Sequence, residues 1–236
     1  MGACVLSVSE IDCSVDAITL GRNLLGQRLV RIVDGVRRSG LIVETEAYVG
    51  IKDQASHAYG GRRTARNESM YLSGGHVYVY FTYGMHHCVN LVCGSLNEPA
   101  AVLIRALQPE EGITEMARSR GRKFDPIHKA VETEAEPQNV SKLLLGLCNG
   151  PGKLSQALEI DRTLDGLLLT NIQKGRRRAG VFSPILYIEK VRQRALPGRL
   201  IAASARVGLG QVGSWKKRNL RFSIIGNPYV SVTVKR

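Results

Sequence analysis

The feature that most constrains the fold of this chain is a series of short β-type segments separated by turns. Residues 27–33 and 40–49 are rich in β-branched side chains and flank the polar pair Asp34-Gly35, a combination typical of a β-hairpin. Further strand-like segments are residues 77–81, 86–93, 100–107, 186–193, 202–207 and 222–234. Because consecutive strands joined by short turns usually pair antiparallel, we predict one antiparallel sheet.

Fewer segments have a helical pattern. Ser14 or Asp16 can cap a helix that ends at Gly26. The other segments with a helical pattern are residues 109–120, 140–147 and 153–160. Residues 119–138 are polar and charged without a clear period, so we predict a flexible surface insertion there. Since no internal repeat or linker is evident, the sequence predicts a mixed α/β (α+β) fold in which residues 1–236 form a single compact domain.

The positive charge of the chain is concentrated in its second half. Residues 1–117 hold ten Lys and Arg against twelve Asp and Glu, whereas residues 118–236 hold 23 against eight. A surplus of this size favours a polyanionic partner, because neutralising phosphates and releasing counterions drives nucleic-acid binding. A basic but inert solvated surface is the alternative. No apolar run approaches the roughly 18 residues of a membrane-spanning helix, and the start lacks a secretion signal, so we expect an intracellular protein without membrane contact.

Cysteine and histidine residues show no pattern typical of a disulfide framework or a metal site. The five cysteines are an odd number at wide spacings, so we expect free thiols. His86, His87, Cys88 and Cys93 lack a recognisable zinc spacing. Residues 150–153 (GPGK) can open a helix whose amides and lysine hold a phosphate, but they do not form a Walker loop. We therefore expect no metal and no other cofactor.

The segment IVETEAY, residues 42–48, brings two carboxylates and an aromatic ring together. A regular strand would place on one face Ile42, Glu44, Glu46 and Tyr48, and on the opposite, packing face Val43, Thr45, Ala47 and Val49. A carboxylate beside an aromatic wall can act as a general base, because the wall excludes water and tunes its pKa. A solvated strand face is the alternative interpretation.

Three tyrosines fall within six positions of the segment YVYFTYGM, residues 78–85. Strand parity places Tyr78 and Tyr80 on one face, while Tyr83 lies beside Gly84 at the tip of a predicted hairpin. Strand aromatics usually pack in a core. On a basic protein, however, flat rings can stack on bases, and a side chain at a tip can fill the gap left by an extruded nucleotide.

Two further residues are ambiguous when they are considered separately. An isolated histidine such as His57 is more often a surface residue than a functional one. Arg105 falls within the apolar run at residues 102–107, where an unpaired charge would be costly. We therefore expect Arg105 to have a carboxylate or phosphate partner, either as part of a site or as a structural salt bridge.

Taken in order, these segments resemble the alkyladenine (3-methyladenine) DNA glycosylase family. The matching segments are residues 42–48, 62–67 with Met70, 78–85, 101–107, GPGKL at 150–154, ARVGLG at 205–210, and LRF with GNPYVSV near the C-terminus. Only residues 1–12, about 119–138 and 173–196 have no counterpart. The resemblance implies a curved antiparallel sheet with a β-hairpin that intercalates into DNA.

The resemblance also implies roles for individual residues. Glu46 corresponds to the general base that activates water, and Arg105 with the backbone carbonyl of Val207 corresponds to the groups that orient this water. The residues implied for the base pocket are Tyr48, His57 and Tyr80, which stack on the flipped base, and Asn90, which disfavours normal guanine by clashing with its exocyclic amino group. The remaining implied contacts are intercalation by Tyr83 and Met85 and phosphate binding by Arg62 and Lys153.

The implied activity is base-excision repair of damaged purines in duplex DNA, including 3-methyladenine, 7-methylguanine, hypoxanthine and ethenoadenine. A methylated purine is already cationic and leaves without a strong general acid. No motif lysine stands in a nucleophile's place, so we expect a monofunctional, monomeric enzyme without a lyase step, located where the DNA is. The alternative is a non-enzymatic nucleic-acid-binding module on the same scaffold, but pure binding has no need of a base such as Glu46.

Overall fold

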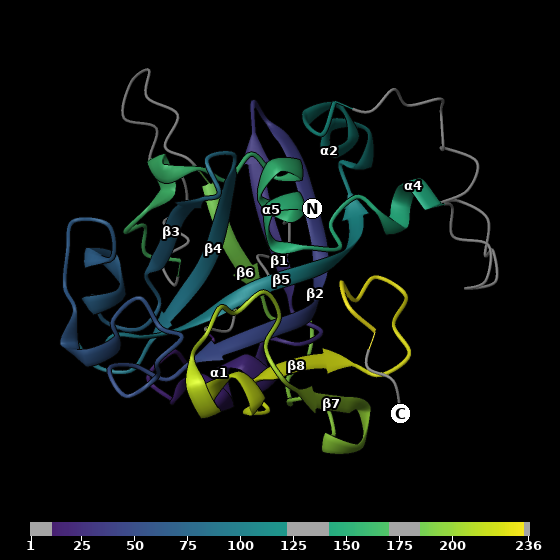
Figure 1. Ribbon diagram of the computed structural model, residues 1–236. Coiled ribbons are helices and arrows are strands. Elements are labelled where there is room, and N and C mark those ends of the chain that lie inside the picture. The colour runs from purple at the N-terminus through teal and green to yellow at the C-terminus, as the bar shows by residue number, and fades with distance from the viewer. Residues whose placement is uncertain (1–10, 122–141, 170–184, 234–236) are drawn as a thin grey trace.

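A curled, eight-stranded antiparallel sheet forms the frame of the molecule (Figure 1). The computed structural model describes residues 11–121, 142–169 and 185–233. The sheet has the order β3-β4-β5-β2-β1-β6, and β8 pairs with both β2 and β7. The strands are β1 (Arg28–Val33), β2 (Val36–Tyr48), β3 (Val77–Thr82), β4 (His86–Cys93), β5 (Ala100–Glu111), β6 (Ile185–Glu189), β7 (Ile201–Ser204) and β8 (Arg221–Ile224).

Short helices connect and cover these strands. They are α1 (Ala17–Asn23), α2 (Ile113–Ser119), α4 (Lys142–Leu145) and α5 (Pro151–Ala157), with 3-10 turns η1 (Tyr59–Gly61), η2 (Glu68–Tyr71), η4 (Arg162–Leu164), η5 (Gly198–Leu200) and η6 (Gly213–Lys217). Asp16 caps α1, because its Oδ1 accepts the N–H groups of Ile18 and Thr19 at 2.8 and 3.1 Å. The described residues form a single α+β domain. No helix in the described ranges is long and apolar enough to cross a membrane.

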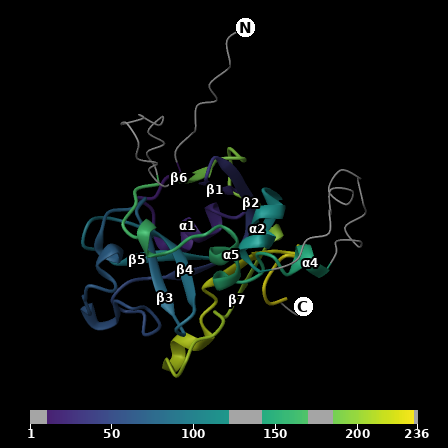
Figure 2. The ribbon, with the colours of Figure 1, turned by 90° about the horizontal axis from the view of Figure 1, so that it is seen from above.

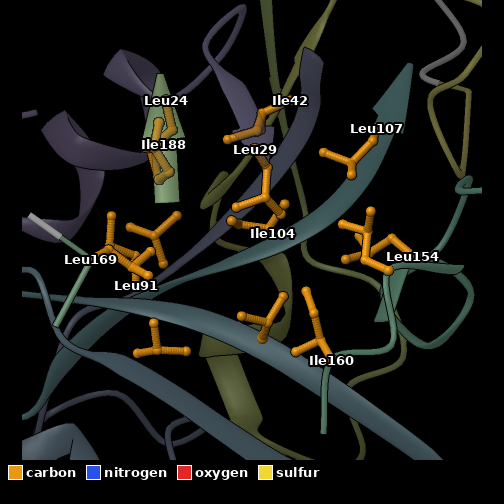
Figure 3. Close-up of a cluster of buried hydrophobic side chains, with 14 of the residues drawn as sticks. Leu24, Leu29, Ile42, Leu91, Ile104, Leu107, Leu154, Ile160, Leu169 and Ile188 are labelled. Carbon is orange, nitrogen blue, oxygen red and sulfur yellow. The ribbon is translucent and has the colours of Figure 1, made fainter. Parts of the chain in front are cut away.

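The main hydrophobic core covers one face of the sheet, and helices from both halves of the chain contribute to it. Figure 3 shows Leu154 and Ile160 with side chains from the central strands. α1 and α5 lie near the centre of the view in Figure 2, and both contact β5. Each places a fully buried leucine in this core, Leu20 and Leu154. Burying one such side chain contributes about 1.5–3 kcal/mol, so this face supplies much of the stability of the fold.

The strand and helix predictions are largely confirmed, with one correction at residues 109–111. These residues extend β5, whereas a helix was expected from Pro109, and α2 begins at Ile113 after Gly112 with φ 69°. β4 pairs only with residues 100–103 of β5, so one edge of β5 has no strand partner at Pro109. A proline is tolerated there because its missing N–H is not needed for a ladder.

The predicted faces of β2 are wrong at Ile42 and Val43. Ile42 is buried in the main core together with Ala47, whereas Val43 packs in a separate cluster with Ala106, Leu144 and Tyr229. The pairing of β2 with β5 shifts register between Ile42 and Thr45, so a bulge interrupts the period of two. Glu44 and Glu46 nevertheless share a face, as predicted.

Several element boundaries differ from the predictions. α5 begins at Pro151, two residues before the predicted helix, and the last strands are shorter than the segments that predicted them. Proline suits the first helical position because no intrahelical hydrogen bond is lost there. The predicted flexible insertion begins in α2, and its residues 122–138 lie outside the described residues, so its flexibility stays a prediction.

Candidate active site

A cavity of about 470 Å³ lies against four neighbouring strands, on the face opposite the main core. Each strand contributes alternate side chains to it: Glu46 and Tyr48 from β2, Tyr78 and Tyr80 from β3, Cys88 and Asn90 from β4, and Leu103 and Arg105 from β5. Their intervening neighbours, such as Val79, Val89 and Ile104, are core residues. The period of two in four adjacent strands therefore produces an apolar face and a cavity face from the same segments.

Glu46 is the buried acidic group of this cavity. Its side chain is fully buried, and its Oε1 accepts the Val207 N–H at 2.7 Å and lies 3.1 Å from Arg105 Nη1. The Tyr48 hydroxyl donates to Oε2 at 3.0 Å. Burial raises the pKa of Glu46 above its usual value, and Arg105 opposes this rise. Such a carboxylate is a stronger base than an exposed one.

Arg105 has carboxylate partners, one of the two kinds of partner that the sequence predicted. Its Nε donates to Glu44 Oε1 at 3.0 Å, and its Nη1 pairs with Glu46. Glu44 is absent from the described residues that line the cavity, because Arg105 and Arg221 cover it. Of the two carboxylates expected to project into one cleft, only Glu46 does so.

Aromatic rings form the wall of the cavity beyond Glu46. The centroids of His57 and Tyr80 lie 4.6 Å apart with their planes at 83°, and Tyr78 lies 5.4 Å from Tyr80. The Tyr78 hydroxyl is 2.7 Å from His57 Nδ1. Burial lowers the pKa of His57, and the charges of Arg66 and Arg62 lower it further. His57 is therefore a neutral ring at neutral pH, held by a neighbour on the same wall.

A buried ion pair that the sequence reasoning missed holds the loops around this wall. Arg206 Nη1 and Nη2 lie 2.6 and 2.8 Å from the two carboxylate oxygens of Asp53, and both side chains are fully buried. The guanidinium of Arg206 also lies 4.7 Å from the centroid of the Tyr48 ring. Arg206 lies beside Val207 in the segment ARVGLG, which resembles a glycosylase motif, so its position could have indicated a role at the site. No sequence motif pointed to Asp53.

Tyr83 and Met85 lie at the tip of the β3–β4 hairpin. Their exposed fractions are 78% and 69%, so neither packs in a core. Tyr83 and Gly84 both have left-handed φ values, 53° and 67°, as tight hairpin turns require. Tyrosine is costly in that conformation, by roughly 1 kcal/mol or more. Tyr83 also borders the cavity, whereas Met85 does not line it.

The other predicted residues have different surroundings. Asn90 lines the cavity and donates from Nδ2 to the Tyr78 carbonyl at 3.0 Å. Arg62 lines an adjoining cavity of about 270 Å³ that shares His57 with the first. Lys153 lies outside both cavities, and its Nζ donates to Asn149 Oδ1 at 2.8 Å. Within the described ranges, no three His, Cys, Asp or Glu side chains are grouped to hold a metal ion.

Comparison with known proteins defines first the class and then the family. Residues 12–228 match the family model described as "Methylpurine-DNA glycosylase (MPG)". Two similar proteins, from Bacillus cereus and Bacillus thuringiensis, are 41% and 40% identical over 218 residues, which cover 92% of this chain and 94% of each relative. A Bacillus cytotoxicus protein is 48% identical over 154 residues, 65% of this chain and 69% of its own length. All three carry the name "Putative 3-methyladenine DNA glycosylase".

This similarity makes the chain an enzyme of the DNA glycosylase class, which acts in the repair of alkylated bases. The match covers most of the chain and includes every segment that forms the cavity. The chain belongs to the methylpurine-DNA glycosylase family.

Proposed function

We propose that the cavity receives a damaged purine flipped out of duplex DNA and that Glu46 activates the water that releases it. One observation carries this proposal: the carboxylate of Glu46 is fully buried, raised in pKa and hydrogen-bonded at the end of an aromatic-walled cavity. A carboxylate whose pKa is raised in this way accepts a proton more readily than an exposed glutamate does.

The proposed reaction is hydrolysis of the N-glycosidic bond. The C1′–N bond breaks, its electron pair stays with the purine, and the water oxygen bonds to C1′ while Glu46 takes the proton of water. The negative charge of Glu46 also stabilises the oxocarbenium-like sugar before attack. Since no lysine is found among the described residues that line the cavity, a Schiff base and a lyase step are not expected.

The walls suit a cationic purine such as 3-methyladenine or 7-methylguanine. Tyr48, His57 and Tyr80 would stack on the flipped base, because a cation is attracted to the face of an electron-rich ring. A neutral His57 does not repel that cation. Asn90 would disfavour normal guanine, whose exocyclic amino group meets its side chain. 7-Methylguanine carries the same amino group, but its positive charge favours stacking on the aromatic walls and makes it a better leaving group. Hypoxanthine and ethenoadenine are neutral, so they would need protonation by solvent or by a donor in the cavity.

The hairpin tip would occupy the duplex while the base is flipped. Tyr83 is exposed and conformationally strained, a combination that folding alone does not favour. A large ring at this position can fill the gap in the base stack, and Met85 can wedge beside it. We assign phosphate contacts to Arg62 beside the cavity and to Lys153 at the start of α5, with the protein acting as a monomer.

The test of this function is Glu46→Gln on duplexes that carry one lesion each. Single-turnover excision should fall by a factor of about 10² to 10⁴, because the proton acceptor is lost. Binding to the lesion duplex should be kept, because the shape of the cavity and its stacking walls survive. Glu115→Gln in α2, outside the cavity, is the matched control and should excise at the parent rate.

Two results would contradict the proposal. Excision retained by Glu46→Gln would move the general base to another residue. A parent protein that binds lesion duplexes tightly but releases no base from any of them would support the binding-module alternative.

A further inference from the structure

Glu44 is a second buried carboxylate beside the cavity, and the proposed chemistry does not use it. Its side chain is fully buried. Its Oε1 accepts hydrogen bonds from Arg105 Nε at 3.0 Å and Arg221 Nη1 at 2.9 Å, and its Oε2 accepts the Ser231 N–H at 2.7 Å. Burial alone would raise the pKa of Glu44, but Arg105, Ser231 and Arg221 together lower it. Glu44 is therefore ionised in the folded protein.

Arg105 lies between the two carboxylates and is bound to both. Its Nε donates to Glu44, its Nη1 pairs with Glu46 at 3.1 Å, and its Nη2 donates to Ser231 Oγ at 3.3 Å. A guanidinium released on its Nε side could turn and form two parallel hydrogen bonds with Glu46. That arrangement would stabilise the Glu46 anion more strongly and make it a weaker base.

The charges of this network balance as two carboxylates and two guanidiniums, Glu44 and Glu46 with Arg105 and Arg221. The other groups that face Glu46 carry no charge at neutral pH. They are the Val207 amide and the buried side chains of Tyr48, Tyr80 and Cys88, whose pKa values burial raises. The proton affinity of Glu46 therefore depends mainly on Arg105 and on the charges that hold Arg105.

We propose that Glu44 is a positioning residue that holds Arg105 in its shared place and so keeps Glu46 basic enough to take a proton from water. This inference rests on the proposed role of Glu46. Glu44 acts through distance and charge and touches no substrate. Arg221 has the opposite effect on Glu46, because it adds a positive charge to the network and partly neutralises Glu44.

The first experiment compares two substitutions that are expected to shift the pH profile of excision in opposite directions. Glu44→Gln removes a negative charge near Glu46, so the acid limb of the single-turnover pH profile should move down by about one pH unit. Arg221→Gln removes a positive charge, so the same limb should move up by a similar amount. The double variant should return the midpoint towards the parent. Glu115→Gln in α2, which removes a carboxylate outside this network and outside the cavity, is the matched control and should leave the midpoint in place.

The second experiment measures Glu46 without excision. Carboxyl ¹³C NMR titration of the protein labelled on glutamate, with the Glu46 signal assigned from Glu46→Gln, should show the same opposite shifts. If the NMR midpoints move as expected but the parent excises nothing, the role of Glu44 stands and the proposed function fails. If excision is present and both variants leave the midpoint unchanged, or move it in one direction, the inference is overturned. Arg221→Gln alone supplies the test if Glu44→Gln does not fold.

Discussion

The two faces of the strands β3, β4, β5 and β2 differ in almost every physical property although they come from the same residues in alternation. Val79, Leu91 and Ile104 on one face are buried among apolar side chains. Glu46 and Arg105 on the other are equally buried but charged. Burying a charge costs several kcal/mol unless a partner offsets it, whereas burying a leucine is favourable. The comparison indicates that the apolar face stabilises the domain. This stability offsets the cost of holding the reactive groups of the other face away from water.

The largest effect on stability should come from the apolar face. Leu91→Ala removes a side chain that is 1% exposed, so the free energy of unfolding should fall by about 2–5 kcal/mol. Excision by the protein that remains folded should stay within about twofold of the parent, because Leu91 points away from the cavity. Denaturant unfolding and single-turnover rates measure the two effects. A large loss of rate with unchanged stability would mean that the faces are not separate in function.

Tyr83→Ala tests the hairpin tip, which belongs to neither buried face. Excision from duplex DNA should slow by about 10- to 100-fold, or about 1.4–2.7 kcal/mol, because the flipped base returns to the stack more often. The deficit should shrink when the lesion lies in a mismatch, where flipping is already easier. Tyr83→Asn should slow excision equally but stabilise the turn, since asparagine tolerates the left-handed conformation. An excision rate unchanged in Tyr83→Ala, or a loss of rate that is the same for paired and mismatched lesions, would contradict the intercalating role.

The pH dependence of excision and of stability tests the consequence of burying Glu46 on the cavity face. Since burial raises its pKa above the usual 4.5, excision should fall about tenfold per pH unit below a midpoint that lies above 4.5. The same shift predicts that ionisation of Glu46 destabilises the fold. The stability contributed by the protonated form is present below pH 4.5 and is lost as pH rises through the pKa in the folded state. Relative to Glu46→Gln, the parent should therefore lose stability over that window, and an acid limb at or below pH 4.5 would contradict the burial argument.

The smallest expected effect is that of a chelator. Because the proposed water is activated by a carboxylate, excision in excess EDTA should match the untreated rate within error. Loss of excision that zinc or magnesium restores would place a metal in the reaction, with His86, His87 or Cys88 as the first residues to examine.

The sequence by itself determined the strands, the parity of the tyrosines, the partner class of Arg105 and the resemblance to a glycosylase family. These are local properties of the sequence or motifs in a fixed order. An alternation of side chains or a motif can be recognised without knowing which residues lie across the sheet. The sequence also limited the N-cap of α1 to Ser14 or Asp16, because capping involves only the next turn, and the structure shows that Asp16 is the cap.

The tertiary structure alone decided which of two neighbouring carboxylates enters the cavity. A bulge in β2 moved Ile42 into the core, and Arg221, 177 positions from Glu44, covered that carboxylate and left Glu46 at the cavity. The ion pair of Asp53 with Arg206 joins loops 153 positions apart, so it too could not be predicted from the sequence. Sequence patterns report on neighbours along the chain, whereas burial, pKa and charge pairing depend on groups brought together across it, so the chemistry of the site needed the folded arrangement.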